Sequence, residues 1–284
     1  MTERLADVTA RISGIQQLGA VVNAMRGIAA ARVQQAAGQL AAADRYAAVI
    51  AAAIGRALAL APAAPPGAAR KPSHPALVLF CAEQGFAGPF SGRVLDSVGT
   101  DLGASELFLV GTRGRTALAE RGMEAGWHDA MPSHSPGVPK LADRVAQALY
   151  KRIAEGGIDH LDVVFSQWQG GRGIQVERRR LFPFDLTGFP HPKVTDAPLL
   201  NLPPAALLRD LTADYMHAQL CKAALHAFAA ENQARMEAMA AARSGIERQL
   251  SSLQAKQRQV RQEEITAEII ELAAGETASR PGTA

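Results

Sequence analysis

The stretch from Leu5 to Leu40 reads LADVTARISGIQQLGAVVNAMRGIAAARVQQAAGQL. Its apolar residues recur at steps of mostly three and four, the spacing that places side chains on one face of a helix. These residues are Leu5, Val8, Ile12, Ile15, Leu18, Val22, Met25, Ile28, Val33, Ala36 and Leu40. The first proline is Pro62, so the pattern predicts one helix within residues 1–62, and roughly 55 helical residues at about 1.5 Å each would span about 80 Å.

The C-terminal part of the chain repeats this pattern. Residues 205–275 contain no proline, and apolar side chains recur through them at helical spacing. They include Leu211, Tyr215, Leu220, Leu225, Phe228, Met236, Met239, Ile246, Leu250, Leu253, Val260, Ile265, Ile269 and Leu272. We expect a second helix over residues 204–275, roughly 105 Å long, followed by a disordered tail at 276–284.

The segment between the two helices, residues 73–192, alternates strand and helix signals. Apolar runs at 76–81, 106–111 and 161–165 predict strands, and residues 173–181 predict a further, more exposed strand. Helical patterns at 89–102, 113–121 and 141–155 lie between them. This β-α-β-α order predicts a Rossmann-like α/β domain with a mostly parallel sheet. Proline-rich stretches at 62–75 and 190–204 predict linkers on both sides.

Two helices of this length cannot bury their apolar stripes inside one small domain. They can bury them by wrapping around each other, and because both leave the same domain, the pair should be antiparallel. The predicted fold is therefore an α/β foot domain with a mostly parallel sheet, plus a long antiparallel two-helix coiled coil formed by the N- and C-terminal helices.

Composition excludes several classes of function. The net charge of +3 is small and dispersed, which argues against a nucleic-acid partner. The most apolar stretch, residues 47–61, carries Arg56 and is too short for direct membrane insertion. The N-terminus does not resemble a signal peptide. Cys81 and Cys221 lie far apart, without metal or disulfide spacing, as expected in a reducing cytosolic setting.

Motifs for phosphate binding or nucleophilic catalysis are missing from the sequence. No lysine follows a glycine, which excludes a Walker A loop. The run at residues 170–173, GGRG, lacks the third glycine of a dinucleotide fingerprint and predicts a turn. The run at residues 88–92, GPFSG, has its serine in the wrong place for a nucleophile elbow.

The remaining polar residues are weak candidates for a metal-binding or partner-binding site. His217 and Cys221 are one helical turn apart, but two ligands do not close a metal site. The basic run at residues 178–180, RRR, should alternate faces on an exposed strand, and an acidic partner is the alternative. We predict no catalytic residue, no metal ligand and no cofactor, and the residues alone indicate an interaction protein.

Four stretches resemble the γ subunit family of F-type ATP synthases. Residues 22–32, VNAMRGIAAAR, are similar to its N-terminal pattern, in which Ala-Met-Lys precedes Val-Ala-Ala. Residues 231–239, ENQARMEAM, and 261–271, RQEEITAEIIE, are similar to its C-terminal patterns, the latter to Arg-Gln-x-x-Ile-Thr-x-Glu-Ile. Residues 83–88, EQGFAG, occupy the place of an Asp-Arg-Gly-Leu-Cys-Gly-like turn after the first strand.

The resemblance implies a rotor subunit without an active site of its own. Its coiled coil would stand inside a hexamer of α and β subunits, and its foot would contact the ε subunit and the membrane c-ring. It would lie peripherally on the cytoplasmic face of the bacterial inner membrane, in a proton- or sodium-transporting complex. The implied contacts with the catalytic β subunit are Met25, Arg26, Arg261, Gln262, Thr266, Glu268 and Ile269.

The sequence also departs from the family pattern. The N-terminal helix has fewer lysines, the turn after the first strand has lost its cysteine, and Pro89 and Ser91 replace a glycine and an asparagine. Two alternatives stay open at this point. One is an α/β small-molecule enzyme with the helices as a dimerisation arm, which requires a closed pocket with convergent polar groups at the strand ends. The other is a coiled-coil adaptor unrelated to ATPases.

Overall fold

A computed structural model describes residues 5–60, 74–185, 188–190 and 200–279. The chain divides into two compact units. The sheet unit comprises Ala29–Arg235, and the helix-pair unit combines Met1–Ile28 with Met236–Ala284.

The two predicted long helices are confirmed. Helix α1 spans Leu5–Leu58, with 54 residues, and helix α6 spans Pro204–Ser279, with 76 residues. Residues 276–279, which the sequence placed in a disordered tail, are therefore helical. Most of the two predicted linkers, at 61–73 and 191–199, lies outside the described residues, as does the end of the tail at 280–284.

The sheet unit contains one five-stranded sheet in the order β3-β2-β1-β4-β5. The strands are β1 (Pro75–Phe80), β2 (Glu106–Val110), β3 (Trp127–Asp129), β4 (His160–Gln169) and β5 (Gly173–Phe182). Strands β3, β2, β1 and β4 are parallel to one another, and β5 pairs antiparallel with β4. The predicted α/β class with a mostly parallel sheet is confirmed.

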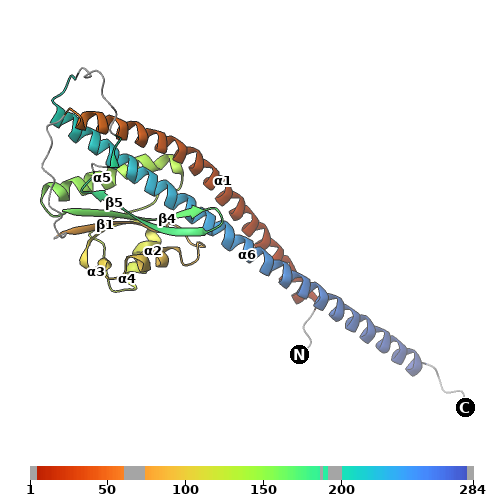
Figure 1. The fold of residues 1–284 in the computed structure, drawn as a ribbon. Helices are drawn as coiled ribbons and strands as arrows, with labels where there is room; N and C mark the ends of the chain where they lie inside the picture. The colour runs from red at the N-terminus through yellow and green to blue at the C-terminus, as the bar shows by residue number, and fades with distance from the viewer. Residues whose placement is uncertain (1–4, 61–73, 186–187, 191–199, 280–284) are drawn as a thin grey trace, which may run out of the picture. The chain divides into compact units, whose positions relative to one another are not determined.

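Helices cover both faces of this sheet, and the side chains of β1 alternate between them. Ala76, Val78 and Phe80 pack in one apolar cluster, while Leu77 and Leu79 pack in another on the opposite face. Helix α5 lies on the first face, and α2, α3 and α4 lie on the second (Figure 1). The elements are α2 (Phe90–Val98), α3 (Asp101–Ala104), α4 (Thr112–Ala119), the 3₁₀ helix η1 (Ser135–Gly137) and α5 (Val138–Ala154).

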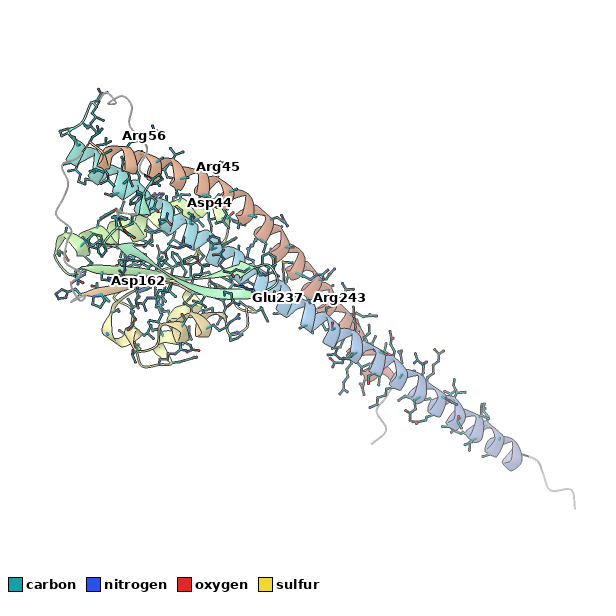
Figure 2. All side chains as sticks on the ribbon, in the orientation of Figure 1. Asp44, Arg45, Arg56, Asp162, Glu237 and Arg243 are labelled. Atoms are coloured by element: carbon teal, nitrogen blue, oxygen red, sulfur yellow. The ribbon has the colours of Figure 1, made fainter. Side chains whose placement is uncertain are left out.

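Within the sheet unit, α1 and α6 also pack against each other. A third apolar cluster joins Ile50 and Ile54 of α1 to Ala218 of α6. Asp44, labelled on α1 in Figure 2, forms an ion pair of 2.6 Å with Lys222 of α6. The same part of α6 presents apolar side chains to the first face of the sheet, so α6 is packed between the sheet and α1.

The helix-pair unit is an antiparallel pair. Gln257 Nε2 donates a hydrogen bond of 2.9 Å to Thr9 Oγ1. Ten residues further along α1, a Cβ placed on Gly19 would lie 3.5 Å from Cγ2 of Ile246. Residue numbers thus rise on one helix as they fall on the other, which confirms the predicted antiparallel arrangement.

The seam of α1 differs in detail from the prediction. Leu18 and Ile28, which the sequence pattern placed on the seam, are 49% and 56% exposed. Positions that alternate steps of three and four, in a seven-residue repeat, are buried or partly buried all along α1, with the single exception of exposed Arg26. They are Leu5, Val8, Ile12, Ile15, Gly19, Val22, Ala29, Val33, Ala36, Leu40, Ala43, Ala47, Ile50, Ile54 and Ala57. Position in the repeat, rather than side-chain size, therefore decides which residues are covered.

Two further local features test the sequence analysis. The run at 170–173 forms the turn between β4 and β5, as predicted, with positive φ at Gly171 and Gly173. Strand β3 was not predicted. Its three residues, Trp127–Asp129, are only partly buried or exposed, so they carry no apolar run that marks a strand.

We predict that Gly114→Ala destabilises the sheet unit. Helix α4 packs so closely on the end of β1 that a Cβ at Gly114 would lie 2.3 Å from Cβ of Cys81. Overpacking of this kind lowers the free energy of unfolding by about 1–3 kcal/mol. Urea unfolding of the purified chain, followed by circular dichroism, measures the change.

The matched control is Gly92→Ala on α2, where a Cβ would meet nothing within 4 Å. Alanine should leave the free energy of unfolding unchanged or raise it by up to about 1 kcal/mol, because alanine favours a helix over glycine. Equal losses in the two variants would contradict the close approach of α4 to Cys81.

Candidate partner-contact site

The predicted contact residues near the end of α6 are all exposed. Val260 is the last residue of α6 that is buried among those whose burial the structure describes, and residues 261–275 are exposed throughout. Thr266 Oγ1 donates a hydrogen bond of 2.8 Å to the carbonyl oxygen of Gln262, within the helix itself. The side chains of Arg261, Gln262 and Glu268 form no hydrogen bond or ion pair with any residue that the structure describes. These groups are available to another chain.

An apolar stripe accompanies them. Ile265, Ile269 and Leu272, spaced four and three residues apart, are 48%, 61% and 74% exposed, and Ile270 is 63% exposed. This spacing is that of a helix seam, yet no described residue of this chain covers it. Exposed aliphatic side chains grouped in this way mark a protein-interaction surface.

Met25 and Arg26 lie on α1 in the same helix-pair unit. Met25 is partly buried and Arg26 is exposed. Leu18, Val21, Met25 and Ile28 follow one another at steps of three, four and three, and we call them the outer stripe. Leu18, Val21 and Ile28 are 49%, 55% and 56% exposed. The sequence analysis missed the outer stripe because it assigned Leu18, Met25 and Ile28 to the seam. What distinguishes these residues from seam residues is that they do not fall on the positions of the seven-residue repeat.

The structure does not bring the predicted contact residues together. The contacts of Thr9 and Gly19 with α6 place Met25 level with about residue 241. Arg261 lies about twenty residues further along that helix, or roughly 30 Å away. The predicted residues therefore form two separate surfaces, one around Met25 on α1 and one over residues 261–272 of α6.

Two other stretches that carry the resemblance do meet, within the sheet unit. The carboxylate of Glu231 on α6 accepts hydrogen bonds from the backbone N–H groups of Glu83 and Gln84, at 3.0 and 3.1 Å. These residues are 148 and 147 positions from Glu231 in the sequence. The turn after β1 is thus attached directly to α6.

The described residues hold no metal-binding group of three or more His, Cys, Asp or Glu side chains. Cys221 Sγ lies 3.8 Å from Nε2 of His217, and that nitrogen is 3.0 Å from Oδ1 of Asp143. Burial raises the pKa of Cys81 and of Cys221 to about 12. Both thiols are protonated near neutral pH and are therefore poor nucleophiles.

The basic run at 178–180 alternates faces of β5, as predicted. Arg178 donates hydrogen bonds of 2.6 Å to Asp162 and to Asp101, with Asp162 lying in the sheet (Figure 2). Arg179 points to the other face, with its guanidinium carbon 5.5 Å from the centre of the Phe165 ring. Arg180 lies 3.9 Å from Asp162 as well, so all three arginines have partners on neighbouring elements of their own chain.

A surface hollow of about 680 Å³ lies beside the end of β1. Its described lining includes Arg113, Arg121 and Ser91 but no histidine or cysteine. Arg121 pairs with Asp96 at 2.5 Å, and Ser91 Oγ accepts the N–H of Ala82 at 3.1 Å. The lining also includes Thr116 and Glu120, but no hydrogen bond joins a hydroxyl of the lining to a carboxylate among the described residues.

Among the described helices, none combines the length and apolarity needed to cross a membrane.

Comparison with known proteins points to one family. A family model described as ATP synthase matches residues 4–278. The ATP synthase gamma chain of Frankia casuarinae is 27% identical, with 100% of both chains covered. That of Moorella thermoacetica is 27% identical, over 95% of this chain and 97% of the other.

The fold is shared with a solved rotor chain. A chain of the mitochondrial ATP synthase rotor of Euglena gracilis superposes with a TM-score of 0.65 at 13% identity, covering 92% of this chain and 98% of that one. At this identity the likeness shows a common fold. The family match, in contrast, covers nearly the whole sequence, and the chain therefore belongs to the ATP synthase family.

Proposed function

We propose that this chain is the γ subunit of a bacterial F-type ATP synthase and forms its central rotor. One observation carries the proposal. The stretch RQEEITAEI, which matches the γ pattern, lies on α6 with every side chain exposed, and its only side-chain hydrogen bonds among the described residues are within α6 itself. A segment that served only the fold of this chain would be covered by it.

The helix pair suits a rotating part. Its seam is held by apolar side chains at a seven-residue repeat, which makes two helices stiffer than one. The outer surface of α1 offers aliphatic side chains around Met25 rather than deep ion pairs. Such contacts are non-directional, so they can form and release without a strongly preferred angle.

The two separate surfaces correspond to two contacts with the catalytic β subunits. Arg261 and Gln262 would hydrogen-bond one loop of a β subunit, with Thr266, Glu268 and Ile269 supporting the same region. Met25 and Arg26 would meet β about 30 Å away along the helix pair. The complementary contacts of the foot are with the ε subunit and the c-ring, on the cytoplasmic face of the bacterial inner membrane.

In this role the subunit carries torque but performs no chemistry. ATP is made or hydrolysed on the β subunits of the hexamer, and protons or sodium ions pass through the membrane part. The rotor function is favoured over the enzyme alternative by the hollow beside β1, in which no described hydroxyl is hydrogen-bonded to a carboxylate of the lining. It is supported over an unrelated adaptor by the family match along the chain.

We expect the double substitution Arg261→Ala with Gln262→Ala to lower ATPase turnover of the assembled complex without reducing assembly. A charge-assisted hydrogen bond contributes about 1.5–3 kcal/mol, so loss of this contact should slow turnover roughly tenfold. Turnover per assembled complex is measured in a coupled ATPase assay.

The matched control is Arg258→Ala with Gln259→Ala, which removes the same two side-chain types one turn earlier on the exposed surface of α6. This control should retain most of the native turnover. Native turnover in the first double variant would remove Arg261 and Gln262 from the mechanism.

A broader test is co-purification with tagged α and β subunits from the same cell. We expect the chain in a stable complex with the hexamer, because its exposed aliphatic residues on α1 and α6 need a partner. Recovery of all the protein as a free chain would contradict the rotor function.

A further inference from the structure

A polar cluster, buried on its α6 side, joins α6 to the carboxyl ends of the parallel strands in the sheet unit. We call it the sheet-end cluster, and its members are Glu83, Gln84, Thr112, Glu231, Asn232 and Arg235. The three residues on α6, Glu231, Asn232 and Arg235, are 3%, 2% and 4% exposed. Charged groups are rarely buried to this degree unless they are paired.

On α6, Glu231 accepts three hydrogen bonds, from the N–H groups of Glu83 and Gln84 and from the guanidinium of Arg235. Arg235 also donates to the carbonyl oxygens of Gln84 and Gly85, at 3.4 and 3.2 Å, and to Asn232 Oδ1 at 2.9 Å. Together these side chains bind both donors and acceptors of the turn after β1.

Glu83 connects the turn after β1 to the ends of the neighbouring strands. Its Oε2 accepts the N–H of Thr112 at 3.0 Å and the N–H of Met131 at 2.9 Å, while its Oε1 accepts the Thr112 hydroxyl at 2.6 Å. Thr112 follows β2 and Met131 follows β3. Gln84 also receives a hydrogen bond of 3.1 Å from Arg32 of α1. One turn thus links both long helices to three strand ends.

Between α6 and the turn after β1, the cluster has no room for a ligand. The cavity beside it, lined by Arg32, Glu83, Glu231 and Arg235 among others, measures about 10 Å³. This is roughly the space of one water molecule. The hydrogen-bonding capacity of these side chains is directed at the protein itself, so their role is to join elements.

The hydrogen bonds of the sheet-end cluster can hold α6 at one rotation about its axis, which apolar packing cannot do. Apolar contacts tolerate rotation of a helix about its axis, because they have no preferred angle. Hydrogen bonds weaken steeply when misaligned. A shift of α6 by one residue would turn it about 100°, remove Glu231 from the turn and leave two backbone N–H groups unpaired. The cluster therefore fixes the rotational setting of α6 on the sheet.

We propose that the sheet-end cluster is the torque-bearing joint of this subunit, through which the sheet unit holds α6 against rotation. Glu231 and Arg235 act as positioning residues for coupling between ion flow and ATP chemistry. The inference rests on the proposed rotor function. It assigns the joint to a few hydrogen bonds at the last turn of α6 within the sheet unit, which ends at Arg235.

The two glutamates allow a sharp test, because glutamine should be tolerated at one and harmful at the other. At Glu83, a glutamine oxygen can accept the N–H groups of Thr112 and Met131 while its NH₂ group donates to the Thr112 hydroxyl oxygen. At Glu231, all three partners are donors, so a glutamine NH₂ group would face an N–H or the guanidinium of Arg235. Both substitutions remove one negative charge and keep the side-chain size.

The experiment compares Glu83→Gln and Glu231→Gln in the complete complex, purified and reconstituted into vesicles. ATP hydrolysis is measured together with ATP-driven transport, with dyes for protons and for sodium, and both are expressed per assembled complex. We expect Glu83→Gln to keep the native ratio of transport to hydrolysis, and Glu231→Gln to lower this ratio at least about twofold, since unmatched donors break the joint.

Arg235→Lys is the second variant, and it tests the proposed joint if the complex with Glu231→Gln does not assemble. Lysine keeps the charge beside Glu231 but cannot reproduce the fork that reaches Gln84, Gly85 and Asn232. It should also lower the ratio of transport to hydrolysis. If the assembled variants kept the native ratio and only the yield of complex fell, the cluster would be structural and the proposal overturned. Failure of the unaltered chain to enter the complex would instead overturn the rotor function.

Discussion

The architecture depends on how an apolar stripe on a very long helix is covered. Helix α1 has 54 residues, far more than the sheet unit could enclose, and its covered positions keep a seven-residue repeat from Leu5 to Ala57. An ideal α-helix drifts relative to such a repeat, so the pair must supercoil to keep the seam closed. Small residues along the seam, such as Gly19, Ala36 and Ala47, allow close approach and leave bulkier side chains for the outside.

The sheet buries its apolar side chains in a different way from the helix pair. Its strands alternate side chains between two helical layers, and β1 at the centre contributes buried residues to both. The carboxyl ends of the parallel strands are where open α/β sheets commonly bind ligands. In this protein, part of that edge is occupied by charged side chains of α6. A place that serves as an active site in many folds is here used for attachment.

The sequence predicted those features that depend on local pattern. The lengths of both helices, the turn at 170–173 and the alternation of Arg178 and Arg179 each follow from spacing or from residue type. Strand β3 could not be predicted, because its three residues gain their conformation from pairing with β2. Nor could the contact between Glu83 and Glu231, since a bond across 148 residues leaves no local signal. The exposed contact residues on α6 were named only through resemblance. Composition alone does not distinguish Ile265, which is exposed, from Ile246, which lies against α1.

The exposed end of α6 also affects how much of the protein accumulates in the cell. Residues 261–275 are helical without cover from the described chain, and a free helix of about fifteen residues is marginal in water. Any partner that binds the helical form stabilises it in proportion to the logarithm of the partner's concentration. Unassembled copies would therefore fray at this end and offer proteases an entry point, whereas bound copies would be protected. Degradation of the surplus could match the amount of this subunit to that of its partners without a dedicated regulator.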